Sequence, residues 1–178
     1  MAFREAVAGA GLTLVLGGAR SGKSRYAEWL IETFPPPWVY VATAEARDTE
    51  MAERIADHKR RRDGRWQTVE APHALAEAVA AVPPGGSLLI DCLTLWLANL
   101  MESGSDIEAR TGALKDVLAQ RSGPTVVVSN EVGLGIVPDN ALARRFRDLQ
   151  GRLNQDLAAA AIRVVMMVAG VPVVVKSP

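Results

Sequence analysis

A chain of 178 residues with 49% hydrophobic and 22% charged residues has the length and composition of a globular protein with one full core, which excludes fibrous and disordered classes. Its 20 basic and 20 acidic side chains cancel, so no overall field draws it to nucleic acid or to a membrane surface, and we expect neither partner. The single cysteine, Cys92, excludes an internal disulfide and favours a cytoplasmic location.

The start of the chain does not have the pattern of a targeting segment. Arg4 and Glu5 interrupt the apolar run that a signal peptide or a membrane anchor would need. We therefore interpret residues 1–11 as an N-terminal extension. Residues 12–178 contain no internal repeat and no long linker, and we expect them to form a single domain.

Apolar runs and turn residues predict an alternation of strands and helices. In chain order we expect a strand at 12–16, a helix from 24 to about 33, a strand at 38–43, a helix at 48–62 capped by Asp48 or Thr49, an extended piece at 65–72, a helix at 72–82, a strand at 87–94, two helices, a strand at 124–130, a long helix from 138–140 to about 161, and a hairpin over 162–176 that turns near Gly170. This order predicts an α/β fold with a mainly parallel sheet, flanking helices and antiparallel edge strands at the C-terminus.

The sequence GGARSGKS follows the first strand, opens the first helix and fits the phosphate-binding pattern GxxxxGK[ST]. In this pattern the glycines let successive N–H groups point at phosphate oxygens, and we expect Lys23 to reach the β and γ phosphates and Ser24 to bind magnesium. A turn that merely links strand to helix is the alternative, which the context disfavours. The predicted nucleotide-binding loop consists of Gly17, Gly18, Ala19, Arg20, Ser21, Gly22, Lys23 and Ser24.

Acidic residues at strand ends are candidates for a second magnesium ligand. Asp91 ends the run SLLID, and we expect its strand to neighbour the strand of the loop; its alternative role is a strand-end cap. Glu131 is a second acidic candidate. Because ligands of open α/β sheets bind at the carboxyl ends of strands, the loops at 17–24, 43–48, 91–95 and 130–138 should share one crevice.

His58 lies on the predicted helix 48–62, on one face with Met51, Ile55 and Arg62. One interpretation is a structural histidine at the end of a packed face. The other is a nucleophile toward a bound nucleotide, because nearby arginines would keep the imidazole neutral and neutral imidazole can attack phosphorus. The arginines in question are Arg54, Arg61 and Arg62, which could also hold a triphosphate, although a solvated basic face would have the same residues.

The motifs together resemble a known family. The blocks GGARSGKSRYAE, VATAEARDTEMAERIADHKRRR, LLIDCLTLWLANLM and VVVSNEVGLGIVPDN, within a match from about Leu12 to Lys176, resemble the bifunctional adenosylcobinamide kinase and adenosylcobinamide-phosphate guanylyltransferase of cobalamin biosynthesis. The resemblance implies a P-loop NTPase-like fold, a homotrimer, and a guanylylated histidine at His58. It also implies nucleotide contacts at Ala42, Thr43, Ala44, Lys59, Arg60, Arg61, Arg62, Glu70 and Asp91.

The implied activity has two steps. ATP or GTP would phosphorylate adenosylcobinamide with Lys23 and Mg²⁺ at the γ-phosphate, and GMP would then pass from GTP through His58 to give adenosylcobinamide-GDP. Because the two steps use different phosphorus atoms, either the nucleotide shifts or the helix that carries His58 moves, and we predict that this helix is mobile. The alternatives are a simple small-molecule kinase with a structural His58, and a non-catalytic GTP-binding module; the absence of an NKxD motif disfavours a GTP switch.

Overall fold

The computed structural model describes residues 10–178, with the side chain of Arg54 excepted; most of the expected N-terminal extension, residues 1–9, lies outside the described residues. The strands are β1 (Leu12–Gly17), β2 (Trp38–Ala42), β3 (Trp66–Glu70), β4 (Ser87–Asp91), β5 (Thr125–Val128), β6 (Arg163–Val168) and β7 (Val171–Lys176). The helices are α1 (Lys23–Glu32), α2 (Thr49–Arg61), α3 (Leu75–Ala80), α4 (Leu93–Glu102), α5 (Ile107–Ala119) and α6 (Ala141–Ala160).

All seven of these strands belong to one sheet, in the order β3-β2-β4-β5-β1-β6-β7. Neighbouring strands are parallel except for the antiparallel pair β6 and β7. The predicted α/β fold, with its C-terminal hairpin, is therefore confirmed. Ala42 pairs with Asp91 and Asp91 pairs with Val128, so the carboxyl ends of three strands lie side by side.

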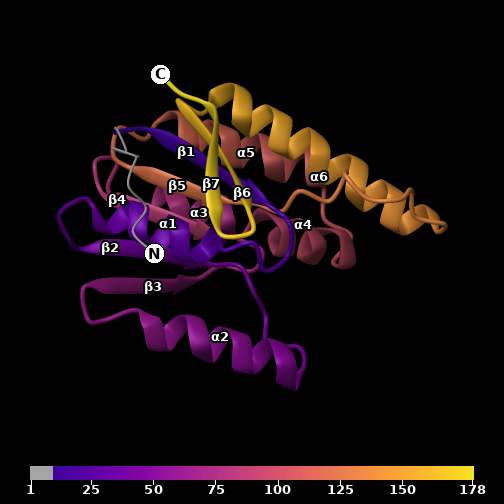
Figure 1. Cartoon of the computed structure of the whole chain (residues 1–178), viewed down its shortest axis with the longest axis horizontal. Helices are drawn as coiled ribbons and strands as arrows, with labels where there is room; N and C mark the ends of the chain where they lie inside the picture. The colour runs from indigo at the N-terminus through magenta and orange to yellow at the C-terminus, as the bar shows by residue number, and fades with distance from the viewer. Residues whose placement is uncertain (1–9) are drawn as a thin grey trace.

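The parallel strands at the centre of the sheet are buried on both faces, whereas the outer strands β3 and β7 are mostly exposed. One hydrophobic core joins Leu14, Val41 and Val127 to helices α3, α4, α5 and α6. The second core lies on the opposite face and joins Val15, Tyr40 and neighbouring strand residues to α1. Figure 1 shows this layered arrangement, with the β6–β7 hairpin crossing the front of the molecule.

Several predicted boundaries differ from the observed ones, among them those of the strand at 87–94 and the helix at 72–82. The strand expected over 87–94 ends at Asp91, where the chain leaves the sheet, and α4 begins at Leu93. The helix expected over 72–82 is shorter and spans only Leu75–Ala80. The long helix begins as predicted, because the side chain of Asn140 caps α6 by accepting a hydrogen bond from Ala143 N at 2.7 Å.

Helix α2 lies apart from the two cores. Figure 1 shows it beyond the edge strand β3, at one end of the molecule. Its N-terminus is capped by Asp48, one of the two predicted caps, which accepts a hydrogen bond from Met51 N at 2.7 Å. None of its described side chains is fully buried. Within residues 10–178, no helix is both long enough and apolar enough to span a bilayer.

Candidate active site

The glycine-rich segment forms a tight loop between β1 and α1. Gly17 and Gly22 have φ angles of 150° and 94°. A Cβ on Gly17 would lie only 2.6 Å from both Met167 O and Ser21 Oγ, so that position accepts only glycine. The Lys23 ammonium folds back across the loop and donates to Gly18 O at 2.6 Å. These features are what the predicted phosphate-binding loop requires.

Two cavities lie side by side at the carboxyl edge of the sheet. The first, which we call the loop cavity, has a volume of about 440 Å³ and is lined by residues of the phosphate-binding loop, by α2 and by the ends of β4 and β5. The second, which we call the side cavity, has a volume of about 420 Å³ and lies between α2 and the ends of β2, β3 and β4. Ser24, His58 and Asp91 line both cavities. The predicted crevice is therefore present and has two compartments.

The predicted site residues divide between these compartments. Five of them line the loop cavity alone: Arg20, Ser21, Gly22, Lys23 and Arg61. The side cavity receives Ala42, Ala44, Lys59, Arg62 and Glu70. Five predicted residues line neither cavity: Gly17, Gly18, Ala19, Thr43 and Arg60.

Thr43 and Arg60 have other contacts instead. The Thr43 hydroxyl donates to Cys92 O at 2.6 Å, and it also accepts from Cys92 N at 2.8 Å. These bonds tie the end of β2 to the end of β4 and fix the start of the loop that leads to α2. Arg60 forms an exposed ion pair with Asp57, so the structure places its charge outside both cavities.

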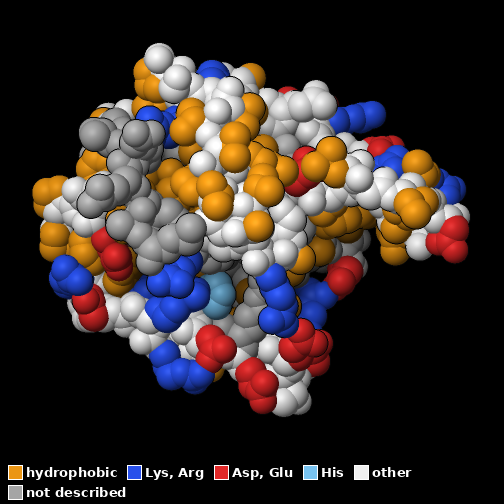
Figure 2. All heavy atoms as spheres, in the orientation of Figure 1, with side chains coloured by type: hydrophobic (Ala, Val, Ile, Leu, Met, Phe, Trp, Pro, Cys, Tyr) orange, Lys and Arg blue, Asp and Glu red, His pale blue; other side chains and the backbone are white. Residues whose placement is uncertain are grey.

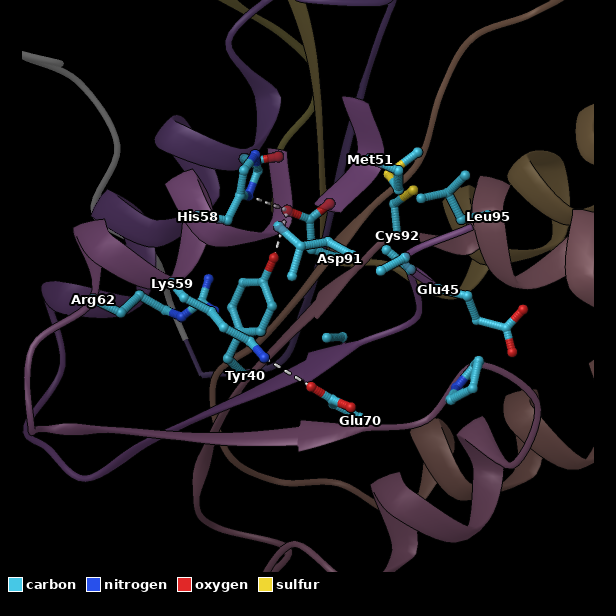
Figure 3. Close-up of a pocket in the computed structure, with 16 residues that line it drawn as sticks. Tyr40, Glu45, Met51, His58, Lys59, Arg62, Glu70, Asp91, Cys92 and Leu95 are labelled. Atoms are coloured by element: carbon cyan, nitrogen blue, oxygen red, sulfur yellow. Dashed lines mark hydrogen bonds and ion pairs between the residues drawn. The ribbon is translucent and has the colours of Figure 1, made fainter. Parts of the chain in front are cut away.

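His58 occupies the boundary between the cavities. Its ring projects from α2 toward the end of β4, where Nδ1 lies 3.8 Å from Asp91 Oδ2 (Figure 3). The Tyr40 hydroxyl donates to the same carboxylate oxygen at 3.0 Å. Met51, Ile55 and Arg62 line the side cavity together with His58, which confirms that they share one face of the helix. Nδ1 is therefore the ring nitrogen on the Asp91 side, and Nε2 is the nitrogen farther from that carboxylate.

The predicted cluster of arginines around His58 is only partly present. The charged group paired with the imidazole is the Asp91 carboxylate, and Arg61 and Arg62 approach Glu28 Oε1 of α1 at 3.5 and 3.8 Å. Arg62 also stacks over the Tyr40 ring, with its guanidinium carbon 3.6 Å from the ring centroid. Two of the three predicted arginine neighbours thus also approach Glu28, and a carboxylate faces Nδ1 of His58, which spacing along the helix did not predict.

Burial changes the chemistry of several groups near the site. Burial raises the pKa of the Glu28 carboxyl to about 7, against the opposing effect of Arg61. Burial also raises the pKa of the Tyr40 hydroxyl well above its ordinary value, and the Asp91 charge adds to this effect. Burial also raises the pKa of the Cys92 thiol to about 11. Cys92 is therefore a buried thiol without the reactivity of a nucleophile.

Two expectations about acidic residues need correction. The strand of Asp91, β4, does not neighbour β1, because β5 lies between them. Asp91 reaches both cavities nevertheless, since all these strands end at one edge. Glu131 lines neither cavity; its carboxylate accepts from Gly133 N at 2.5 Å within its own loop. Of the segment 130–138, only Asn130 reaches a cavity, and sequence reasoning did not single it out.

Comparisons with known proteins agree with this geometry. The family described as "Cobinamide kinase / cobinamide phosphate guanyltransferase" matches residues 13–175. The chain is 45% identical over 166 residues to the bifunctional adenosylcobalamin biosynthesis protein CobP of Pseudomonas aeruginosa, with 92% of this chain and 96% of the relative covered. It is 42% identical over 181 residues to the protein named bifunctional adenosylcobalamin biosynthesis protein CobU of Salmonella typhimurium, with 93% and 99% covered.

Solved structures resemble the chain in fold alone. A type III secretion system ATPase from pathogenic bacteria matches with a TM-score of 0.56 at 10% identity, over 88% of this chain and 50% of that one. The flagellar accessory protein FlaH of Methanocaldococcus jannaschii matches with a TM-score of 0.51 at 13% identity, over 94% and 78%. These matches agree with the P-loop fold that the loop sequence predicts.

Proposed function

The chain belongs to the cobinamide kinase / cobinamide phosphate guanyltransferase family, and we propose that it performs both of these reactions on adenosylcobinamide within the two adjoining cavities. The observation that carries this proposal is the position of His58. Its imidazole stands where the cavity of the phosphate-binding loop meets a second cavity of nucleoside size. A kinase that used only the loop would have no need for a nucleophile at that boundary.

We propose that one nucleotide spans both compartments. The β and γ phosphates would lie on the loop against Lys23, and the nucleoside would occupy the side cavity, which leaves the α-phosphate beside His58 at the shared wall. Ser24 and Asp91, which line both cavities, offer hard oxygen ligands of the kind that Mg²⁺ takes alongside phosphate and water. When bound there, Mg²⁺ would neutralise developing charge on the phosphates.

In the kinase step the substrate hydroxyl attacks the γ-phosphorus, and the nucleoside diphosphate leaves. Lys23 would stabilise the charge that develops on the phosphoryl oxygens, because its buried ammonium already lies along the loop. The product is adenosylcobinamide phosphate. ATP and GTP both fit this role, since the loop binds phosphates alone.

In the guanylyl step Nε2 of His58 attacks the α-phosphorus of GTP, and pyrophosphate leaves with the bonding electron pair. The Asp91 carboxylate, on the Nδ1 side, would orient the ring and balance the positive charge that the imidazole gains. A phosphate oxygen of adenosylcobinamide phosphate then attacks the same phosphorus, and the N–P bond breaks. The product is adenosylcobinamide-GDP, with His58 restored.

Glu70 offers a reason for guanine at this step. Its carboxylate lies at the rim of the side cavity, paired with Lys59 Nζ at 2.9 Å. A carboxylate accepts hydrogen bonds only, and guanine presents adjacent N–H donors on its Watson–Crick edge where adenine presents an acceptor. We therefore propose that Glu70 helps to select GTP for guanylyl transfer.

Mass spectrometry of the intact protein tests the proposal. After incubation with GTP and Mg²⁺, we expect an added GMP that maps to the His58 peptide under alkaline conditions, which preserve a phosphoramidate. The His58→Ala variant should lose the adduct and guanylyl transfer but retain most of its kinase activity. His73→Ala is the matched control and should keep the adduct: His73 itself lines neither cavity, although its partner Glu45 lines the side cavity. Phosphoryl transfer without any adduct in the wild type would instead support a simple kinase.

We also propose that the chain assembles as a homotrimer in the cytoplasm. Exposed apolar side chains gather on the β6–β7 hairpin and on the segment before α6, where Ile136 is 97% exposed; Figure 2 shows apolar surface over these regions. Surfaces of this kind are commonly covered by a partner. Light scattering coupled to size exclusion should give three times the chain mass of 19.0 kDa, and a monomer would contradict the assembly.

A further inference from the structure

Asn130 stands where β5 ends beside the phosphate-binding loop. Ser129 N donates to Val15 O and Glu131 N donates to Gly17 O, each at 3.0 Å, so the chain on both sides of Asn130 is bonded to β1 and to the first residue of the loop. Since β5 is the strand that separates β1 from β4, Asn130 lies between the loop and Asp91 along the sheet edge.

The pleat of the chain determines which way the Asn130 side chain points. Val128 belongs to the core on the α1 face of the sheet, and Ser129 turns to the other face, where its hydroxyl donates to Asn154 Oδ1 at 2.6 Å. Successive side chains of an extended chain alternate between faces, so Asn130 returns to the α1 face, where the loop lies. Its place in the lining of the loop cavity, together with Val128 and Lys23, agrees with this direction.

The backbone of Asn130 is held firmly. Its N–H donates to Thr94 Oγ1 at 2.8 Å, and its carbonyl accepts from Asn154 Nδ2 at 3.0 Å. Asn154 is in turn buried against Gln150, whose amide donates to Asn154 Oδ1 at 3.0 Å. Helices α4 and α6 thus fix Asn130 from behind, as a preorganised site needs.

The carboxamide of Asn130, in contrast, makes no hydrogen bond with any residue in the range 10–178. Three other polar groups of this lining have protein contacts: Lys23 bonds Gly18, Asp91 bonds Tyr40, and Arg61 bonds Glu28. The buried Ser21 hydroxyl, like the Asn130 amide, has no hydrogen-bond partner among the described residues. Because its backbone is fixed and its carboxamide makes no hydrogen bond within the protein, Asn130 can hydrogen-bond a ligand that enters the cavity. Because an amide is neutral, it can both donate to an oxyanion and accept from a hydroxyl.

We infer that Asn130 is a catalytic residue of the kinase step: its Nδ2–H donates to a γ-phosphoryl oxygen, and its Oδ1 accepts from the attacking hydroxyl of the substrate. This role rests on the proposed function. During transfer the hydroxyl oxygen bonds to the γ-phosphorus, the bond to the β–γ bridging oxygen breaks, and the nucleoside diphosphate takes that electron pair. The hydroxyl proton leaves to solvent, since an amide cannot hold it. In the guanylyl step the γ-phosphate departs within pyrophosphate, so this contact matters less there.

The test compares both steps in the same protein preparations. Phosphoryl transfer from γ-labelled ATP and GTP to cobinamide measures the kinase, and covalent labelling from α-labelled GTP measures the guanylyl step. For Asn130→Ala we expect kcat of the kinase to fall about 100-fold, with KM for the nucleotide and the extent of His58 labelling each changed less than about threefold. Asn130→Asp should reduce the kinase further, because it places a negative charge against the phosphate.

The control is Asn140→Ala, which removes a helix cap outside both cavities and should leave both steps intact at a temperature where the variant is folded. A kinase that is unaffected by Asn130→Ala would overturn the role of Asn130 alone. Equal loss of both steps together with a lower melting temperature would also overturn it, in favour of a structural role. A wild-type protein that labels with GMP but does not phosphorylate cobinamide would overturn the proposed kinase function itself.

Discussion

Helices α1 and α2 both contribute to the candidate active site, but different forces hold them in place. Helix α1 buries Tyr26, Leu30 and Ile31 in the core on one face of the sheet. Helix α2 lies outside the sheet edge, and its described contacts with other elements are mainly ion pairs, such as Lys59 with Glu70 and Arg61 with Glu28. The helix that follows the phosphate-binding loop is thus packed into the core, whereas the proposed nucleophile, His58, lies on a helix that is attached by polar contacts.

This difference has a consequence for the two reactions. Ion pairs at a protein surface are each worth less than about 1 kcal/mol, whereas one buried aliphatic side chain is worth about 2 kcal/mol or more. A helix held by the weaker kind of contact can move without unfolding the protein. The expected movement of α2 between the two steps stays a prediction, and differences in activity and stability between variants of the two helices test it.

The largest expected effect concerns the loop. Lys23→Ala should reduce both phosphoryl transfer and GMP labelling by about 1000-fold, because in both steps Lys23 would contact the phosphates of the bound nucleotide. Rates measured at saturating nucleotide with each labelled substrate check this. Lys115→Ala, which removes a lysine on α5 paired with Asp156, is the matched control and should retain both activities. Loss of only one activity in Lys23→Ala would mean that the two steps do not share the loop.

A matched pair of isoleucines compares how the helices are packed. Ile31 of α1 is fully buried, whereas Ile55 of α2 is partly exposed at the side cavity. Ile31→Ala should lower the free energy of unfolding by about 4 kcal/mol and Ile55→Ala by about 1 kcal/mol, because only the first leaves a closed cavity in the core. Urea unfolding measures both values. Similar losses would show that α2 is as firmly packed as α1 and would contradict its attachment by polar contacts.

The parts of this contrast that sequence could predict are the local ones. Three predictions depend on residues close together in the chain: the loop pattern between strand and helix, a helix cap at Asp48 or Thr49, and the face shared by Ile55 and His58. The structure confirms them, with Asp48 as the cap. The pairing of Arg61 with Glu28 joins residues 33 positions apart, and spacing along one helix carries no information about it.

The order of the strands in the sheet could not be predicted from the sequence, because it too depends on contacts between distant segments. Sequence periodicity identifies β4 and β5 as strands, but the insertion of β5 between β1 and β4 is set by pairing between distant segments. For that reason Asp91 was expected next to the loop strand, and Asn130, which occupies that neighbouring position, was overlooked. The terminal Ser-Asn of the run PTVVVSN was the available signal, since polar residues at a strand end in this fold lie at the ligand edge.

Glu28 of α1 contacts Arg61 of α2, and its titration should make the free energy of unfolding depend on pH. Burial holds the pKa of its carboxyl near 7, above the ordinary value of 4.5, so the folded protein binds this proton more tightly than the unfolded chain does. The contribution is fully present below pH 4.5 and is lost as pH rises through about 7. A shift of this size corresponds to at most about 3 kcal/mol, and contact of the site with solvent reduces our expectation to about 2 kcal/mol. The unfolding free energy of the wild type, relative to Glu28→Gln, should therefore decrease by about 2 kcal/mol between pH 4.5 and pH 8.

Urea unfolding of both proteins across this pH range isolates the Glu28 contribution, because the other titrating groups are common to the pair. Glu108→Gln, an exposed substitution of the same type on α5, is the control and should follow the wild type. If the difference instead grew as pH rose, the charged form of Glu28 would be the stabilising one, and its ion pairs with Arg61 and Arg62 would outweigh the cost of burial. Helix α2 would then be tethered more strongly than its exposed contacts imply, and its movement during the reaction would have to begin elsewhere than at Glu28.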